Sequence, residues 1–183
     1  MEDWQEREEL LIGKDNIDKL KNATVAVFGC GGVGSYTVEA LARAGIGNFV
    51  LVDKDVVDVT NINRQLVADF STIGRDKVEV EKERILRVNP DAKVEIYKEF
   101  YCEENKEKLN IKDYTYIVDA IDSVSSKLSL IITAHEKNVK IISAMGMGNK
   151  LDPTQIEVSD ISKTSVCPLA KTIRKQLRAK GIN

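Results

Sequence analysis

The chain lacks any apolar segment that approaches the roughly 20 residues needed to span a membrane as a helix. Its first residues also lack the basic and then apolar pattern of a secretory signal. Only three cysteines occur, far apart and without a Cys-x-x-Cys pair, which disfavours both a disulfide framework and a structural zinc site. We therefore expect a cytoplasmic protein that has reduced thiols and contacts no membrane.

The composition is that of one folded domain rather than of a disordered chain. Hydrophobic residues make up 43% and charged residues 31% of the sequence, a balance that supports a single core. The net charge of −2 gives no reason to expect strong general attraction to nucleic acid. Basic residues cluster near the end of the chain, at Lys163, Lys171, Arg174, Lys175, Arg178 and Lys180. This cluster is either a local basic patch or the solvated face of an amphipathic helix packed through Leu169, Ile173 and Leu177.

Segments of strand character alternate with segments of helical character along most of the chain. Strand-like runs occupy residues 24–28, 49–52, 94–97, 116–118, 139–144 and 155–158. Helical patterns follow the first run up to Gly45 and recur from about residue 75 to 88 and from 128 to 137. The alternation predicts an α/β fold, a Rossmann-like doubly wound, mostly parallel sheet with helices on both faces.

A glycine-rich loop connects the first predicted strand to the first predicted helix of this sheet. Its glycines are Gly29, Gly31, Gly32 and Gly34. Without side chains in the way, backbone amides can approach a phosphate, and the start of the helix adds partial positive charge. Asp53 follows the second strand, where its carboxylate can accept hydrogen bonds from a ribose. The spacing alone is typical of NAD binding as much as of ATP binding, and a glycine turn without a ligand is the third alternative.

Further polar residues favour a triphosphate over a dinucleotide. Asn61, Arg64 and Gln65 lie in the loop after the second strand, and Lys77 begins the next helix. Arginine binds phosphate through two parallel hydrogen bonds, and cations neutralise the charge of a triphosphate during attack on its α-phosphorus. A dinucleotide-binding redox enzyme instead holds its pyrophosphate mainly through the glycine loop. Taken singly, Arg64 and Lys77 are each better explained as an exposed surface charge.

A pair of carboxylates, Asp119 and Asp122, ends the fourth predicted strand. Mg²⁺ keeps most of its water and needs only one or two protein oxygens, so Asp122 is a candidate ligand for a magnesium ion beside the phosphates. The alternative is that Asp122 only caps the next helix.

These residues together resemble, in order and spacing, the adenylation domain of ubiquitin-activating-like enzymes, the ThiF/MoeB superfamily. The matching elements are the glycine loop, Asp53, the Asn61 to Gln65 block, Lys77 and the Asp119–Asp122 pair. Residues 39–47, 119–123 and 152–156 look like the tRNA threonylcarbamoyladenosine dehydratase branch. The resemblance covers nearly the whole chain. It implies an N-terminal helical segment at 1–22, a nucleotide-binding core at 23–150 and the start of a crossover segment at 151–183.

The resemblance implies a homodimer that binds ATP and Mg²⁺. Such enzymes adenylate the carboxylate of N6-threonylcarbamoyladenosine at position 37 of tRNA and promote its cyclisation, releasing AMP and pyrophosphate. The resemblance assigns the glycine loop, Asn61, Arg64, Gln65 and Lys77 to the nucleotide, with Asp53 at its ribose and Asp122 at magnesium. Arg7 matches an arginine that family members donate across the dimer interface, and its alternative is an exposed helical residue.

Departures from the superfamily pattern bear on the choice of branch. Lys127 stands where the sulfur-carrier and ubiquitin branches have arginine, and only Cys167 stands in the region of their zinc-binding cysteines. Both departures favour the tRNA branch. Cys167 is either a catalytic cysteine or a small packing residue. Family members usually continue well beyond this point, so we expect the chain to be truncated at its C-terminal end.

Two other functions stay open at this point. The first is an activator that adenylates the C-terminal Gly-Gly of a ubiquitin-like sulfur carrier, and the second is an NAD-dependent oxidoreductase. A sulfur-relay protein also stays open as a further partner.

Overall fold

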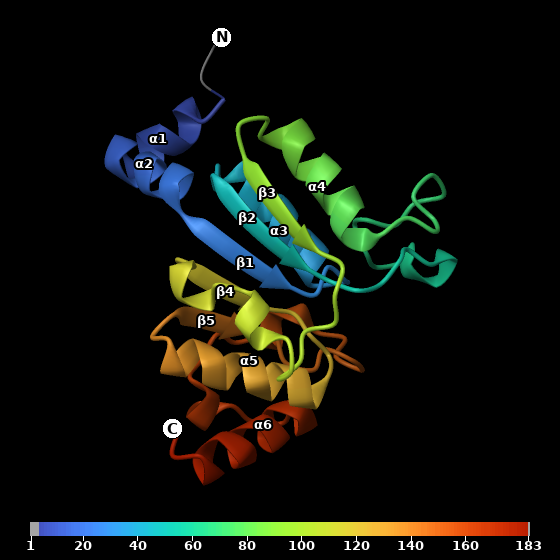
Figure 1. Cartoon of the computed structure of the whole chain (residues 1–183), viewed down its shortest axis with the longest axis vertical. Coiled ribbons are helices and arrows are strands. Elements are labelled where there is room, and N and C mark those ends of the chain that lie inside the picture. Colours follow the sequence, from blue (N-terminus) through green and yellow to red (C-terminus); the bar gives the residue numbers. More distant parts are fainter. Residues whose placement is uncertain (1–3, 183) are drawn as a thin grey trace.

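The computed structural model of the chain describes residues 4–182. Its five strands form one parallel sheet in the order β3-β2-β1-β4-β5 (Figure 1). The strands are β1 (Thr24–Phe28), β2 (Asn48–Val52), β3 (Lys93–Tyr97), β4 (Tyr116–Asp119) and β5 (Lys140–Ser143). The helices are α1 (Glu6–Ile12), α2 (Lys14–Asn22), α3 (Gly34–Arg43), α4 (Lys77–Val88), α5 (Val124–Glu136) and α6 (Pro168–Ala179). The predicted Rossmann-like α/β fold is confirmed, and within the described residues the sheet is wholly parallel.

Both faces of the sheet are buried because apolar residues occupy successive positions of its central strands. Side chains alternate between the faces of a strand, so Val25 and Val27 of β1 join one core cluster while Ala26 and Phe28 join the other. The first cluster includes residues of α3 and α4, and the second includes residues of α5. Helices therefore cover both faces, as a parallel sheet requires.

The strand order creates a crevice at the carboxyl ends of β1 and β4. The chain runs outward from β1 through β2 to β3, and then returns to place β4 on the other side of β1. The loops that follow β1 and β4 therefore leave the sheet toward opposite faces and open a gap between them. In open α/β sheets this reversal point is where ligands bind. Phe28, the last residue of β1, pairs in register with Asp119 of β4, so the two loops begin side by side.

The sixth predicted strand, residues 155–158, is wrong. The segment begins in a short 3-10 helix, Pro153–Gln155, whose start is capped by Asp152, and continues as irregular chain. Ile156 and Val158 favoured a strand, but both are exposed and face no sheet. Other boundaries shift by a few residues: α4 begins at Lys77 rather than near residue 75, and α5 begins at Val124 rather than 128.

The last helix, α6, packs against α5 (Figure 1). Its contacts are made by the buried residues Ala170, Ile173 and Leu177. Within residues 4–182, no helix combines the length and the apolar character that crossing a membrane requires.

Candidate active site

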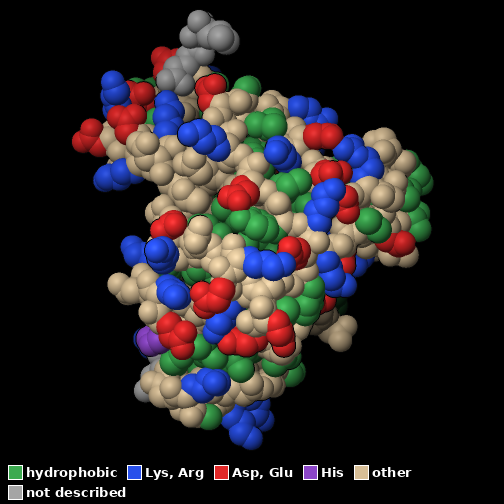
Figure 2. Space-filling view, viewed as in Figure 1, with side chains coloured by type: hydrophobic (Ala, Val, Ile, Leu, Met, Phe, Trp, Pro, Cys, Tyr) green, Lys and Arg blue, Asp and Glu red, His purple; other side chains and the backbone are tan. Residues whose placement is uncertain are grey.

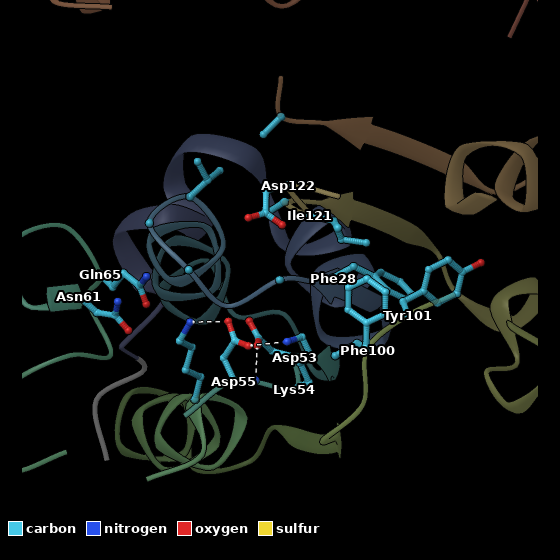
Figure 3. A pocket seen from close by; sticks show the side chains of 18 of the residues that line it. Phe28, Asp53, Lys54, Asp55, Asn61, Gln65, Phe100, Tyr101, Ile121 and Asp122 are labelled. Carbon is cyan, nitrogen blue, oxygen red and sulfur yellow. Dashed lines mark hydrogen bonds and ion pairs between the residues drawn. The ribbon is translucent and has the colours of Figure 1, made fainter. Parts of the chain in front are cut away.

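A cleft of about 500 Å³ opens at the carboxyl ends of the strands (Figure 3). It is bounded by the glycine loop after β1, the end of β2, the loop before α4, and the loops that follow β4 and β5. Its size lies within the range typical of small-molecule sites. The crevice expected from the strand order is therefore present as an open cavity.

Two glycines give the loop after β1 its shape. Gly29 has a φ of +91°, and a Cβ there would lie 2.7 Å from the backbone oxygen of Ala120. A Cβ on Gly34 would lie 1.7 Å from the oxygen of Gly29, so no larger residue fits at the start of α3. Gly29, Gly31 and Gly32 line the cleft, whereas Gly34 does not. Gly34 thus packs the helix against the loop, and the other three glycines leave backbone open toward the cavity.

Asp53, at the end of β2, ties the glycine loop to the neighbouring strand. One carboxylate oxygen accepts a hydrogen bond of 2.7 Å from the amide of Cys30, and the other accepts one of 2.8 Å from the amide of Asp55. Burial, and then the nearby charges of Glu81 and Asp53, raise the pKa of the Cys30 thiol. Cys30 is therefore a packed thiol, and Asp53 presents a fixed carboxylate in the cleft.

Lys77 brings a positive charge into the cleft from the first turn of α4. Its Nζ lies 3.1 Å from Oδ2 of Asp55, and the lysine side chain is 6% exposed while that of Asp55 is 49% exposed. The backbone amide of Lys77 also donates to the carbonyl of Asp55 at 3.0 Å. Burial alone would raise the pKa of Asp55, but the hydrogen bonds and charges of Lys77 and then of Lys54 outweigh it and lower that pKa. The lysine is thus fixed at both its backbone and its ammonium.

The loop before α4 contributes Asn61, Arg64 and Gln65 to the cleft. The Oδ1 of Asn61 accepts from the amide of Asp58, which holds the loop in a capping box. Nη1 of Arg64 donates to the carbonyl of Thr60 and to Oδ1 of Asn63, both at 2.9 Å, and the side chain remains exposed. Oε1 of Gln65 is buried without a hydrogen-bond partner among residues 4–182. The loop therefore presents one exposed guanidinium and one unsatisfied acceptor.

The two aspartates after β4 have different environments. Asp119 is fully buried, and its Oδ2 lies 2.8 Å from Nζ of Lys127, which also donates to the carbonyl of Ala144 at 3.0 Å. Burial raises the pKa of the Asp119 carboxyl, and the charge of Lys127 opposes that rise. Ala144 lines the cleft, so this buried pair joins the loops after β4 and β5. Asp122 is exposed and lines the cleft (Figure 3).

The donor set fits a cation shared with a ligand rather than a closed metal site. Among residues 4–182, no group of three or more His, Cys, Asp or Glu side chains could hold a metal ion. Mg²⁺ needs only one or two carboxylates when phosphates and water complete its shell. Asp122 is available for such a role, because Asp119 pairs with Lys127 and Asp55 pairs with Lys77.

Cys167 lies at the edge of the cleft, at the start of α6. Its Sγ accepts from the amide of Gly146 at 3.3 Å and from that of Ala170 at 3.5 Å. Partial burial would raise the pKa of this thiol, but the backbone hydrogen bonds outweigh it and the pKa is lowered. The sulfur therefore caps the helix and fastens it to the loop that carries Gly146.

The cleft collects most of the residues that the sequence predicted for a site. Gly29, Gly31, Gly32, Asp53, Asn61, Arg64, Gln65, Lys77 and Asp122 all line it. Gly34 and Arg7 do not, since Gly34 packs behind the loop and Arg7 is exposed on α1.

Sequence reasoning missed Lys54, Asp55 and Phe100, which also line the cleft. The ammonium of Lys54 lies 5.8 Å from the centre of the Phe100 ring. The acidic residues at 53 and 55, placed directly after a strand, were a usable signal for Asp55. Phe100 carried no such signal, because it follows the edge strand β3 and reaches the cleft only through the fold.

Comparison with known proteins places this geometry in a family. A model of the ThiF family matches residues 6–182. The tRNA threonylcarbamoyladenosine dehydratase of Bacillus subtilis (strain 168) is 48% identical over 176 residues, covering 96% of this chain and 69% of the relative. That of Haemophilus influenzae is 45% identical over 168 residues, covering 92% and 64%. The crystal structure of the E. coli enzyme TcdA in complex with ATP has a TM-score of 0.93 and 38% identity, covering 98% of this chain and 75% of that chain. The chain thus spans about two thirds of the length of both curated relatives.

Proposed function

This chain belongs to the ThiF family, and we propose that it acts as an ATP-dependent tRNA threonylcarbamoyladenosine dehydratase. The observation that carries the proposal is the 48% identity to a relative of that name, over 96% of the chain. The cleft supports it, since fixed cations, an exposed carboxylate and a glycine loop surround one cavity. The substrate is the carboxylate of N6-threonylcarbamoyladenosine at position 37 of tRNA.

ATP would lie across the glycine loop. Backbone amides of the loop and the start of α3 face its phosphates, because Gly31 and Gly32 leave the approach open. Asp53 accepts hydrogen bonds from the ribose through lone pairs that its two backbone contacts leave free. Arg64 and Lys77 neutralise the triphosphate, with Asn61 and Gln65 supplying hydrogen bonds beside them.

Asp122 is the proposed protein ligand of Mg²⁺. A magnesium ion bound there with the phosphates supplies positive charge to the leaving pyrophosphate. The role of the protein is to hold one exposed carboxylate next to the glycine loop. The buried Asp119–Lys127 pair fixes the loop that carries Asp122.

Two substitutions make up the reaction. A carboxylate oxygen of the substrate attacks the α-phosphorus of ATP, the bond to the bridging oxygen breaks, and pyrophosphate leaves. A nucleophilic atom of the same modified side chain then attacks the acyl carbon, that side chain releases one proton to water, and AMP leaves with the oxygen that joined it to the acyl carbon. Since both groups belong to one side chain, the effective molarity of the second attack is high. The ring closure needs no nucleophile from the protein, so Cys167 can serve as a helix cap alone.

A homodimer belongs to the same proposal, with Arg7 reaching the ATP of the partner. Arg7 is exposed on α1 and lies outside the cleft of its own protomer. The neighbouring Leu10 and Leu11 are 85% and 84% exposed, as expected of residues that a second copy covers.

A sulfur-relay partner remains an expectation without a residue to support it.

The test is ATP–pyrophosphate exchange and AMP release with different stimuli. We expect both signals with tRNA that carries N6-threonylcarbamoyladenosine, and neither with the same tRNA lacking the modification. Stimulation only by a protein ending in Gly-Gly would assign the chain to sulfur-carrier activation instead. Binding of NAD without binding of ATP in a calorimeter would favour an oxidoreductase.

A further inference from the structure

The helix α6 and the residue after it carry an unbalanced positive charge. Residues 168–180 contain five lysines and arginines and no carboxylate, in a chain whose net charge is −2. In Figure 2, blue side chains occupy the lowest part of the molecule, where Figure 1 places α6. The overall charge therefore conceals a local basic surface.

Three of these cations form a row along one flank of the helix. Lys171, Lys175 and Arg178 recur at helical spacing, beside the apolar row that packs on α5. All three are exposed, and none forms an ion pair with any residue in the described part of the chain. We call these three residues the cationic row.

The other two cations of the helix have different surroundings. Arg174 is half-buried and donates to the carbonyl of Thr164 at 2.9 Å, which fastens the preceding segment to α6. Lys180 lies within the electrostatic reach of Glu103. By helical spacing it falls on the flank opposite the cationic row. Asp160, in the segment that packs beside α6, forms no ion pair with the row, and the cation that acts on its carboxylate is Lys163. These contacts leave the row itself uncompensated.

The row begins next to the cleft. Leu169, in the first turn of α6, lines the cavity, and Cys167 holds the helix start to Gly146, another lining residue. A helix of 12 residues extends for about 18 Å at 1.5 Å per residue. The cationic row thus leads from the rim of the cleft outward over the surface.

We propose that the cationic row binds the sugar–phosphate backbone of tRNA beside the modified nucleotide. The inference rests on the proposed function. In that function the modified side chain of the tRNA nucleotide enters the cleft to meet ATP, and the phosphates on either side of that nucleotide stay outside the cleft. Lysine and arginine contacts to phosphate fix position without reading sequence, so the row orients the RNA strand. It supplies the attraction to RNA that the net charge of the chain does not.

The test compares two triple variants of the full chain. The first, K171Q/K175Q/R178Q, removes the row, and the matched control, K14Q/K19Q/K21Q, removes three exposed lysines from α2 at the opposite end of the molecule. The affinity for tRNA carrying N6-threonylcarbamoyladenosine is measured from 50 to 200 mM salt. Each lost phosphate contact lowers the slope of log affinity against log salt by about 0.7 to 0.9. We expect the slope of the first variant to be smaller than that of the wild type by about 2, and its affinity for the tRNA to be at least about tenfold lower. The control should keep the wild-type slope and affinity for the tRNA. Both variants should keep the wild-type dissociation constant for ATP.

Equal salt slopes in the first variant and the wild type would overturn the inference, and so would an equal loss in the control. AMP formation separates this failure from failure of the proposed function. If the wild-type chain forms AMP with modified tRNA, the proposed function is supported even when the cationic row does not bind RNA. If the wild-type chain binds ATP but never forms AMP with modified tRNA, the proposed function is wrong. A charge-conserving variant, K171R/K175R/R178K, should restore the wild-type slope and so exclude an effect of altered folding.

Discussion

The ammonium of Lys77 lies 3.1 Å from a carboxylate oxygen of Asp55 inside the cleft. Lys77 comes from the first turn of α4, and Asp55 comes from the loop after β2. The lysine is nearly buried and its partner is half exposed. The ion pair therefore positions the Lys77 ammonium in the cleft in the absence of a nucleotide. A triphosphate would take over the ammonium from Asp55.

Replacing Lys77 should reduce adenylation more than it reduces stability. We expect Lys77→Met to slow ATP–pyrophosphate exchange by roughly tenfold or more, since a contribution of about 1.4 kcal/mol to the transition state corresponds to that factor. Lys82→Met is the control, because Lys82 lies on the same helix outside the cleft. Exchange at the wild-type rate in Lys77→Met would remove this lysine from the site.

Asp122 should govern the requirement for magnesium. In Asp122→Asn the carboxylate that faces the cleft is lost, so we expect the Mg²⁺ concentration for half-maximal exchange to rise by roughly tenfold. Asp91→Asn is a suitable control, because Asp91 is exposed and lies outside the cleft. Identical magnesium titrations of Asp122→Asn and the wild type would show that Asp122 has no role in metal binding.

The buried pair of Asp119 and Lys127 should be sensitive to loss of one partner. Lys127→Met leaves a buried carboxylate without its counter-charge, and we expect the free energy of unfolding to fall by about 3 to 5 kcal/mol. The double variant Asp119→Asn with Lys127→Met should recover a substantial part of that loss, because neither charge then remains. Denaturant unfolding measures both changes. Equal destabilisation of the single and double variants would mean that the two residues do not act as a pair.

Glu81 gives the protein a pH dependence of stability. It is fully buried in α4, and neither of its carboxyl oxygens has a hydrogen-bond partner among residues 4–182. Burial raises its pKa to about 8. The charge of Arg84 lowers this pKa and that of Glu39 raises it further, both to a smaller extent. Between the ordinary value of 4.5 and about 8, the folded state keeps a proton that the unfolded state releases. The free energy of unfolding should therefore decrease as the pH rises through this window, by up to about 1.4 kcal/mol per pH unit.

Glu81→Gln removes the titrating group and should flatten this decrease. Unfolding by urea at a series of pH values measures it, with Glu136→Gln, an exposed substitution on α5, as the control. A wild-type profile that matches that of Glu81→Gln would contradict a neutral buried acid at this position.

Arg7 can be tested by mixing subunits. If it acts on the ATP of a partner, a heterodimer of Arg7→Ala and Arg64→Ala protomers contains one site with both arginines intact. We therefore expect the mixture to regain exchange activity that neither variant has alone. Absence of recovery in a mixture shown to contain heterodimers would leave Arg7 without a role in trans.

The sheet, the glycine loop and most of the cleft could be predicted because their signals are local. The apolar runs at β1 and β2 and the glycines between strand and helix report the backbone that they form. The family was also identified correctly from the same residues. These features need no knowledge of distant contacts.

The remaining features depend on contacts that the sequence does not display. Ile156 has the character of a strand residue but stays exposed, because its segment pairs with none of the five strands. A lysine is expected at the surface, yet Lys127 is fully buried because Asp119 compensates its charge. Phe100 reaches the cleft only through the fold.

Transfer of a labelled oxygen tests most directly whether the substrate carboxylate attacks ATP. Modified tRNA whose threonyl carboxylate carries ¹⁸O at both oxygens would be turned over with ATP, and the AMP released would be examined by mass spectrometry. Attack on the α-phosphorus followed by ring closure predicts AMP that contains one ¹⁸O atom. AMP without the label, or ADP in its place, would contradict carboxylate adenylation in this cleft.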